Sequence, residues 1–213
     1  MTLLESLEKQ FDLLNHESMS ELVALDLTGE KSKSLAHGWA DNAQEALDWI
    51  DQVEFDWPHA SLYIGVADRA CTTQIGTRAK REDIEAVTCI VLDIDPERAN
   101  GSRQMATKDE RWAAGWAASA INMYLITHGF YGGVKLDSGN GIALYLPIER
   151  ILVNDEPELD RKIATFMEML RPVIADYKAK IDSTFDLPRL TRLAGSVNRK
   201  GPDQSLWRES RWL

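Results

Sequence analysis

Two aspartates close the most apolar segment of this 213-residue sequence. Asp93 and Asp95 end the run Val87–Asp95 (VTCIVLDID), which is rich in β-branched residues and is followed by a proline, as is typical of a strand and its end. Since residues i and i+2 of a strand share a face, both carboxylates project together, while Leu92 and Ile94 point toward the core. Neighbouring carboxylates repel unless a cation lies between them, and hard oxygen ligands suit Mg²⁺ or Mn²⁺. From spacing alone, the other interpretation is a strand end that runs into solvent, where two aspartates have no metal to bind.

A glycine-rich turn follows, between predicted strands at residues 133–136 and 142–146. Its residues are Asp137, Ser138, Gly139, Asn140 and Gly141. Asn-Gly is a strong hairpin signal, and spacing alone favours a plain type I′ turn. The functional interpretation is that the glycines let backbone N–H groups approach phosphates.

The third motif is the stretch 180–201, KIDSTFDLPRLTRLAGSVNRKG, which combines one acid with several cations. The chemistry-bearing residues are Asp182, Arg189, Arg192, Arg199 and Lys200. Arginine forks bind phosphate through two hydrogen bonds, and lysine supplies a point charge. The competing interpretation is an amphipathic turn with solvated charges.

Charge is unevenly distributed along the chain. Lys and Arg number 24 and Asp and Glu 34, for a net charge of −10, which argues against a wholly basic nucleic-acid binder. Residues 180–213, however, carry seven cations against four acids. Such a basic end on an acidic body either holds phosphates locally or is a solvated tail, and charge alone does not choose.

Several other function classes lack support in the sequence. No stretch reaches the roughly 20 apolar residues of a membrane helix, and residues 1–18 do not read as a signal peptide. With two cysteines, Cys71 and Cys89, a disulfide framework is excluded, and we expect a cytoplasmic protein with no membrane partner. No Walker-type phosphate loop is present. We expect structural roles for His16, His37, His59 and His128. The i, i+4 spacing of Trp112 and Trp116 predicts helix packing and not a base-stacking platform.

The elements that must position these motifs indicate one α+β domain, because strands and helices do not alternate regularly. We predict helices at residues 3–14, 43–53, 107–127 (opened by a Thr107–Glu110 capping box) and from Asn154 or Asp155 to Ile174, with a kink at Pro172. We predict further strands at 21–27 and 60–66 and a loop at 68–81.

Taken in order, the three motifs resemble the archaeo-eukaryotic primase superfamily, in particular the primase-polymerase domains of phages, plasmids and mobile elements. The family's acidic DxD corresponds to Asp93-Ile94-Asp95, its SGNG hairpin to residues 138–141, and its third acid to Asp182. The segment LPRLTRLAGSVNRKG (187–201) is similar to the family's arginine-rich stretch. The resemblance covers nearly the whole chain, residues 21–211.

The resemblance implies a single primase-polymerase catalytic domain over residues 1–213, or the N-terminal part of a longer primase-helicase. Its fold would be an RRM-like sheet with flanking helices, joined to an N-terminal α/β unit across the active cleft. The implied activity is that of a DNA primase or DNA polymerase, which makes or extends primers on single-stranded DNA from NTP or dNTP substrates. A helicase domain or protein is a further implied partner.

The resemblance also assigns roles to residues. Asp93, Asp95 and Asp182 would be catalytic and would hold two Mg²⁺ or Mn²⁺ ions. The nucleotide phosphates would be bound by Ser138, Gly139, Asn140, Gly141, Arg189, Arg192 and Lys200, with the cations also available to hold the template.

One position departs from the family. A histidine normally lies two residues after the SGNG turn and contacts the nucleotide phosphates, but Ala143 occupies that position here. A methyl group cannot donate a hydrogen bond, so we expect weaker nucleotide binding or turnover. Two rival functions stay open: a catalytically impaired replication initiator or nucleotide- or single-strand-binding module, and a two-metal nuclease.

Overall fold

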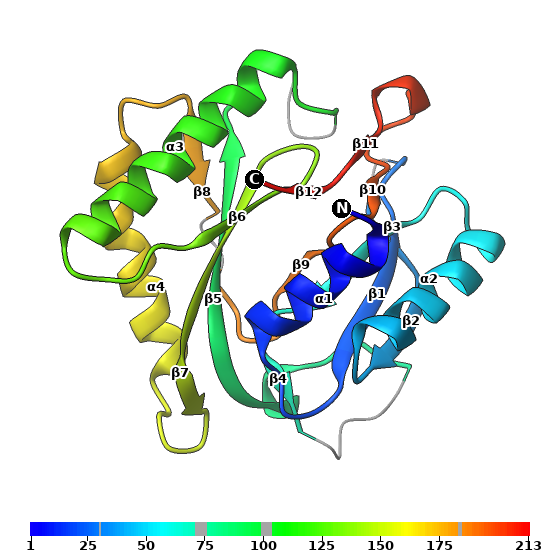
Figure 1. Cartoon of the computed structure of the whole chain (residues 1–213), viewed down its shortest axis with the longest axis horizontal. Coiled ribbons are helices and arrows are strands. Elements are labelled where there is room, and N and C mark those ends of the chain that lie inside the picture. The colour runs from blue at the N-terminus through cyan, green and yellow to red at the C-terminus, as the bar shows by residue number, and fades with distance from the viewer. Residues whose placement is uncertain (30, 71–75, 99–103, 183–184) are drawn as a thin grey trace.

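Two main antiparallel sheets and four α-helices make up the part of the chain that the computed structural model describes, residues 1–29, 31–70, 76–98, 104–182 and 185–213 (Figure 1). The predicted α+β class is confirmed. None of the helices in these ranges combines the length and apolar character needed to cross a lipid bilayer.

The first sheet belongs mostly to the N-terminal part of the chain. Its strand order is β2 (Lys33–Ala40), β1 (Ser20–Asp26), β3 (Ser61–Gly65) and β9 (Leu190–Arg192). Helices α1 (Leu3–Leu14) and α2 (Ala43–Asp56) accompany it, opened by the side chains of Thr2 and Asn42. Strand β9 returns from late in the chain to pair with β3, so this sheet is completed by the arginine-rich stretch.

The second sheet contains the motif strands. Its order is β12 (Arg211–Trp212), β6 (Val134–Asp137), β7 (Ile142–Leu152), β5 (Ile84–Pro96) and β4 (Asp68–Arg69), with β8 (Ala179–Ile181) paired to the end of β5. With helices α3 (Lys108–Thr127) and α4 (Leu159–Leu170), the chain runs β5-α3-β6-β7-α4-β8, a split βαβ arrangement in antiparallel pairing. The shorter elements are β10 (Val197–Asn198), β11 (Arg208–Glu209) and the 3₁₀ turns η1 (Arg81–Asp83), η2 (Arg171–Ile174) and η3 (Gln204–Leu206).

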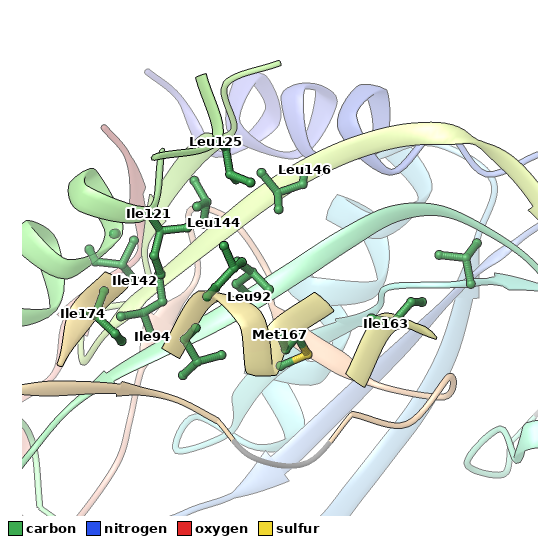
Figure 2. Packing of buried hydrophobic residues seen from close by; sticks show 14 of the residues in the cluster. Leu92, Ile94, Ile121, Leu125, Ile142, Leu144, Leu146, Ile163, Met167 and Ile174 are labelled. Atoms are coloured by element: carbon green, nitrogen blue, oxygen red, sulfur yellow. The ribbon is translucent and has the colours of Figure 1, made fainter. Parts of the chain in front are cut away.

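Strands β5 and β7 separate two apolar clusters. On one face, Leu92, Ile94 and Leu144 pack against α3 and α4, as Figure 2 shows. On the other face, Val91 and Tyr145 join a second cluster that includes residues of α1, α2, β1 and β3. Because the second cluster draws on both sheets, burial of apolar surface holds the two sheets together.

Most predicted elements are present. The Thr107–Glu110 capping box opens α3, and after α4 the chain continues as the 3₁₀ turn η2 that contains Pro172. Strand β2 was not predicted, β7 continues to Leu152, and α4 starts at Leu159 rather than near Asn154, because residues 153–157 form a turn that returns β7 toward the helix layer.

Two local interpretations were wrong. Asp68 and Arg69, predicted as loop, form β4 and are fully buried, where Arg69 pairs with Glu21 at 2.5 Å. Trp112 and Trp116 do not pack into the core, since the apolar stripe of α3 toward the sheet consists of smaller residues, among them Ala114, Ala117 and Ile121. Cys89 is buried and free, and Cys71 lies outside the described residues.

Candidate active site

The three predicted acids lie side by side, although Asp182 is distant in sequence. Asp93 and Asp95 project from one face of β5 into a cleft of about 110 Å³. Strand β8 pairs with the end of β5, and the Asp182 N–H donates to the Asp93 carbonyl oxygen at 2.9 Å. The antiparallel register therefore brings the third acid beside the first.

Arg189 is the counter-ion of two of these acids. Its Nη2 lies 2.8 Å from Asp182 Oδ2 and 3.8 Å from Asp93 Oδ2. No group of three His, Cys, Asp or Glu side chains among the described residues is arranged to hold a metal ion. The three predicted ligands, Asp93, Asp95 and Asp182, are thus neighbours, and the Arg189 guanidinium forms ion pairs with Asp93 and Asp182.

Asp93 is the acid whose charged form is least favoured. Burial raises its pKa to about 7, the negative charges of Asp95 and Asp182 act in the same direction, and Arg189 and Lys200 oppose them. Its side chain is 43% exposed and lines the cleft. An added cation would relieve this repulsion.

The Ser138–Gly141 turn is pressed against the acids. A Cβ on Gly141 would lie 2.7 Å from the Ile94 carbonyl oxygen and 3.0 Å from Asp95 Oδ1, so only glycine permits this approach. Gly139 has a φ of +83°. Gly141 of the predicted phosphate turn therefore lets the turn lie against β5, and Gly139 supplies the left-handed backbone conformation next to Asn198 and Arg208.

The turn's amides are largely engaged. Ser138 N donates to Gly141 O, Gly139 N to Asp137 Oδ1 and Gly141 N to Ser138 Oγ, at 3.0, 2.8 and 3.1 Å. Asn140 Oδ1 accepts from Ala106 N. The expectation that free N–H groups cradle phosphates therefore needs revision for these three amides, because they already donate inside the protein.

The opposite wall carries cations held by the first sheet. Arg192 lies over the Tyr63 ring, 4.2 Å from its centroid, and donates to Tyr63 Oη at 2.8 Å across the β3–β9 pair. Lys200 also lines the cleft, and burial and the charge of Arg98 lower its pKa. Arg199, by contrast, is committed to Glu54 at 2.7 Å. Three cations of the basic stretch, Arg189, Arg192 and Lys200, thus line the cleft and are not part of a solvated tail.

Sequence reasoning missed two residues of the cleft. Tyr63 fixes the guanidinium of Arg192, and Asn198 donates from Nδ2 to Ser138 O at 2.9 Å, tying the turn to β10. Asn198 lies within the third motif, but the sequence does not show that its side chain is buried against the turn. Tyr63 lies in an ordinary apolar strand, and no sequence pattern there indicates a role in the cleft. Ala143 pairs with Asp93 and points its methyl group into the cleft.

No family model and no curated protein matches the chain. Among solved structures, the chain is similar to a polymerase domain from Mycobacterium tuberculosis ligase D in complex with DNA, with 14% sequence identity and a TM-score of 0.49. The likeness covers 92% of this chain and 75% of that one.

Proposed function

We propose that the chain is a nucleotidyltransferase, a DNA primase or DNA polymerase that joins nucleoside triphosphates on a single-stranded DNA template. In this reaction a 3′-hydroxyl oxygen attacks the α-phosphorus, and the bond to pyrophosphate breaks. The observation that carries the proposal is one cleft that Asp93, Asp95, Arg192 and Lys200 line together, with Asp182 next to Asp93 and bound to the lining residue Arg189. The split βαβ order of the second sheet agrees with the RRM-like core that the resemblance implies.

The donor set fits a hard divalent cation. Mg²⁺ in phosphate-transfer sites is held by one or two carboxylates and by substrate phosphates, and a cation bound beside Asp93 would oppose the burial and the negative charges that raise the pKa of this carboxyl. Asp93 and Asp95 would hold the first Mg²⁺ or Mn²⁺ ion, and Asp182 would contribute to the second. Bound ions would supply charge stabilisation at the attacking and leaving oxygens.

The remaining groups orient the triphosphate. Arg192 is fixed against Tyr63, so its fork is preorganised for phosphate oxygens, and Lys200 adds a point charge from the same wall. The Ser138–Gly141 turn forms part of the cleft lining and sets its shape through the close approach of Gly141 to Asp95. Arg189 limits repulsion among the acids before substrate arrives.

The test is incorporation of labelled nucleotides on primed and primer-free single-stranded DNA with Mg²⁺ or Mn²⁺. Asp95→Ala should lower incorporation at least about 100-fold, since metal-assisted charge stabilisation contributes several kcal/mol. Glu97→Ala is the matched control, because Glu97 follows on the same chain segment, is exposed and lies outside the cleft. Equal synthesis by the unchanged chain and Asp95→Ala would contradict the proposal.

A second candidate, a binding module that has lost catalysis, is favoured by one observation. Ala143 presents a methyl group opposite Asp93, where the resemblance places a phosphate-binding histidine. DNA or nucleotide binding without synthesis, in both the unchanged chain and Ala143→His, would select this function. Degradation of DNA that depends on Asp93 would select a nuclease instead.

A further inference from the structure

Two exposed indoles distinguish the outer surface of α3. Trp112 and Trp116 are 56% and 59% exposed, and their ring centroids lie 6.4 Å apart. The opposite stripe of the helix, with Ala114, Ala117 and Ile121, fills the core. Large aromatic side chains that the fold does not bury mark a surface for something else to cover.

These indoles line a groove of about 530 Å³ between α3 and the edge formed by β6 and β12. Gly115 lies between them in sequence, and a Cβ at this position would meet nothing within 4 Å, so no side chain fills the groove there. The charged residues of this aromatic groove are Lys108, Arg111, Lys135, Arg211 and Asp137. Four cations and one acid on a chain of net charge −10 make the groove complementary to a polyanion.

The groove adjoins the active-site cleft. Arg111 pairs with Asp137, whose other oxygen accepts from Gly139 N at 2.8 Å in the phosphate turn. Asp137 and Ile142 line the groove, while Ser138 and Ala143 line the cleft. A strand lying in the groove would therefore pass directly beside the turn that bounds the cleft.

We infer that the aromatic groove binds single-stranded nucleic acid, with bases stacked on Trp112 and Trp116 and phosphates held by the surrounding cations. Aromatic platforms with flanking cations are the general means of binding single strands. The two ring planes are tilted by 38° to each other, so the indoles present separate faces, each of which can take one base. That the bound strand is a template rests on the proposed function. Binding of the strand itself needs neither metal nor catalysis.

The experiment measures fluorescence anisotropy of a labelled oligodeoxythymidine of about 16 nucleotides, without metal ions or nucleotide. The double variant Trp112→Ala/Trp116→Ala should bind about ten-fold or more weakly. Trp57→Ala is the matched control, since Trp57 is partly exposed at the end of α2, outside the groove, and should leave binding unchanged. Thermal unfolding of each variant checks that folding is retained.

Two further arms separate stacking from charge. An abasic strand of equal length should bind more weakly than the thymidine strand and should not respond to the double variant. Lys108→Glu/Arg211→Glu should reduce the dependence of binding on salt concentration. Equal strand binding by the double variant and the unchanged chain would overturn the inference, as would an equal loss on the abasic strand or stronger binding of poly-glutamate than of DNA.

Failure of this inference is distinguishable from failure of the proposed function. If Asp95→Ala binds the strand normally and the chain makes no product, the groove stands and the proposed activity fails. If synthesis depends on Asp95 but the double variant binds the strand as the unchanged chain does, the activity stands and the groove assignment is wrong.

Discussion

The two faces of β5 carry opposite kinds of side chain within four consecutive residues, 92–95. Leu92 and Ile94 are fully buried against α3 and α4, whereas Asp93 and Asp95 face the cleft. Burial of the first pair stabilises the fold, while the second pair gathers negative charge that burial and mutual repulsion disfavour. One strand therefore supplies both the rigid support of the site and the charges that the site uses.

Leu92→Ala should give the largest change in stability. The side chain has no exposed surface, so its truncation leaves a cavity and lowers the free energy of unfolding by about 2–5 kcal/mol. Denaturant titration measures this, with the partly exposed Leu206→Ala as the control. A loss below about 1 kcal/mol in the free energy of unfolding would mean that the Leu92 face of β5 does not provide the rigid support of the site.

Ala143→His should change the cleft face instead. An imidazole at this position, opposite Asp93, would offer a donor to phosphate, and a charge-assisted hydrogen bond contributes about 1.5–3 kcal/mol, or roughly 10- to 100-fold in nucleotide affinity. Titration with a labelled nucleoside triphosphate measures this. Ala143→Leu adds volume without a donor, and equal gains in the two variants would refute the hydrogen-bonding argument.

Gly141→Ala tests the contact between the turn and β5. The added Cβ meets the Ile94 carbonyl oxygen and Asp95, so the turn must move, at a cost of about 1–3 kcal/mol in unfolding free energy. Gly115→Ala is the opposite case, because its Cβ meets open space within α3, where replacing glycine contributes up to about 1 kcal/mol. Equal changes in thermal stability would show that the close approach is unimportant.

Asp93→Asn should increase stability and remove part of its pH dependence. The folded state raises the pKa of this carboxyl to about 7, so its protonated form is favoured on folding. The stabilisation is complete below the ordinary carboxyl pKa of about 4 and is lost as pH rises through about 7. The variant should therefore gain about 1 kcal/mol over the unchanged chain at pH 8, after allowance for screening in the cleft, and little at pH 4.

Unfolding curves at both pH values measure this difference in the absence of added metal. A constant difference across pH would contradict the raised pKa. With Mn²⁺ present the advantage of Asp93→Asn should shrink or reverse, since bound cation stabilises only a folded chain that holds it.

The sequence predicted the parts of the site that depend on local pattern. Period-two alternation assigned Asp93 and Asp95 to one face, and the capping box located the start of α3. The ion pairs of Arg189 were not predictable, because they depend on β8 pairing with the end of β5 and on β9 pairing with β3, both from far along the chain. The i, i+4 spacing of Trp112 and Trp116 is the same whether the two residues are buried or exposed. The face of α3 that packs in the core consists largely of alanines, which hydrophobicity alone does not distinguish from a surface stripe.

Strand β9 has a consequence for how the protein is made. Tyr63 of β3 pairs with Arg192, so the edge of the first sheet has no strand partner there until residue 192 has been synthesised. A ribosome-bound N-terminal half therefore exposes an open β-edge beside apolar surface, the arrangement most prone to pair with another chain. Once made, β9 pairs with β3, replaces it as the edge strand and brings Arg192 to the cleft, so the cleft is completed late in synthesis.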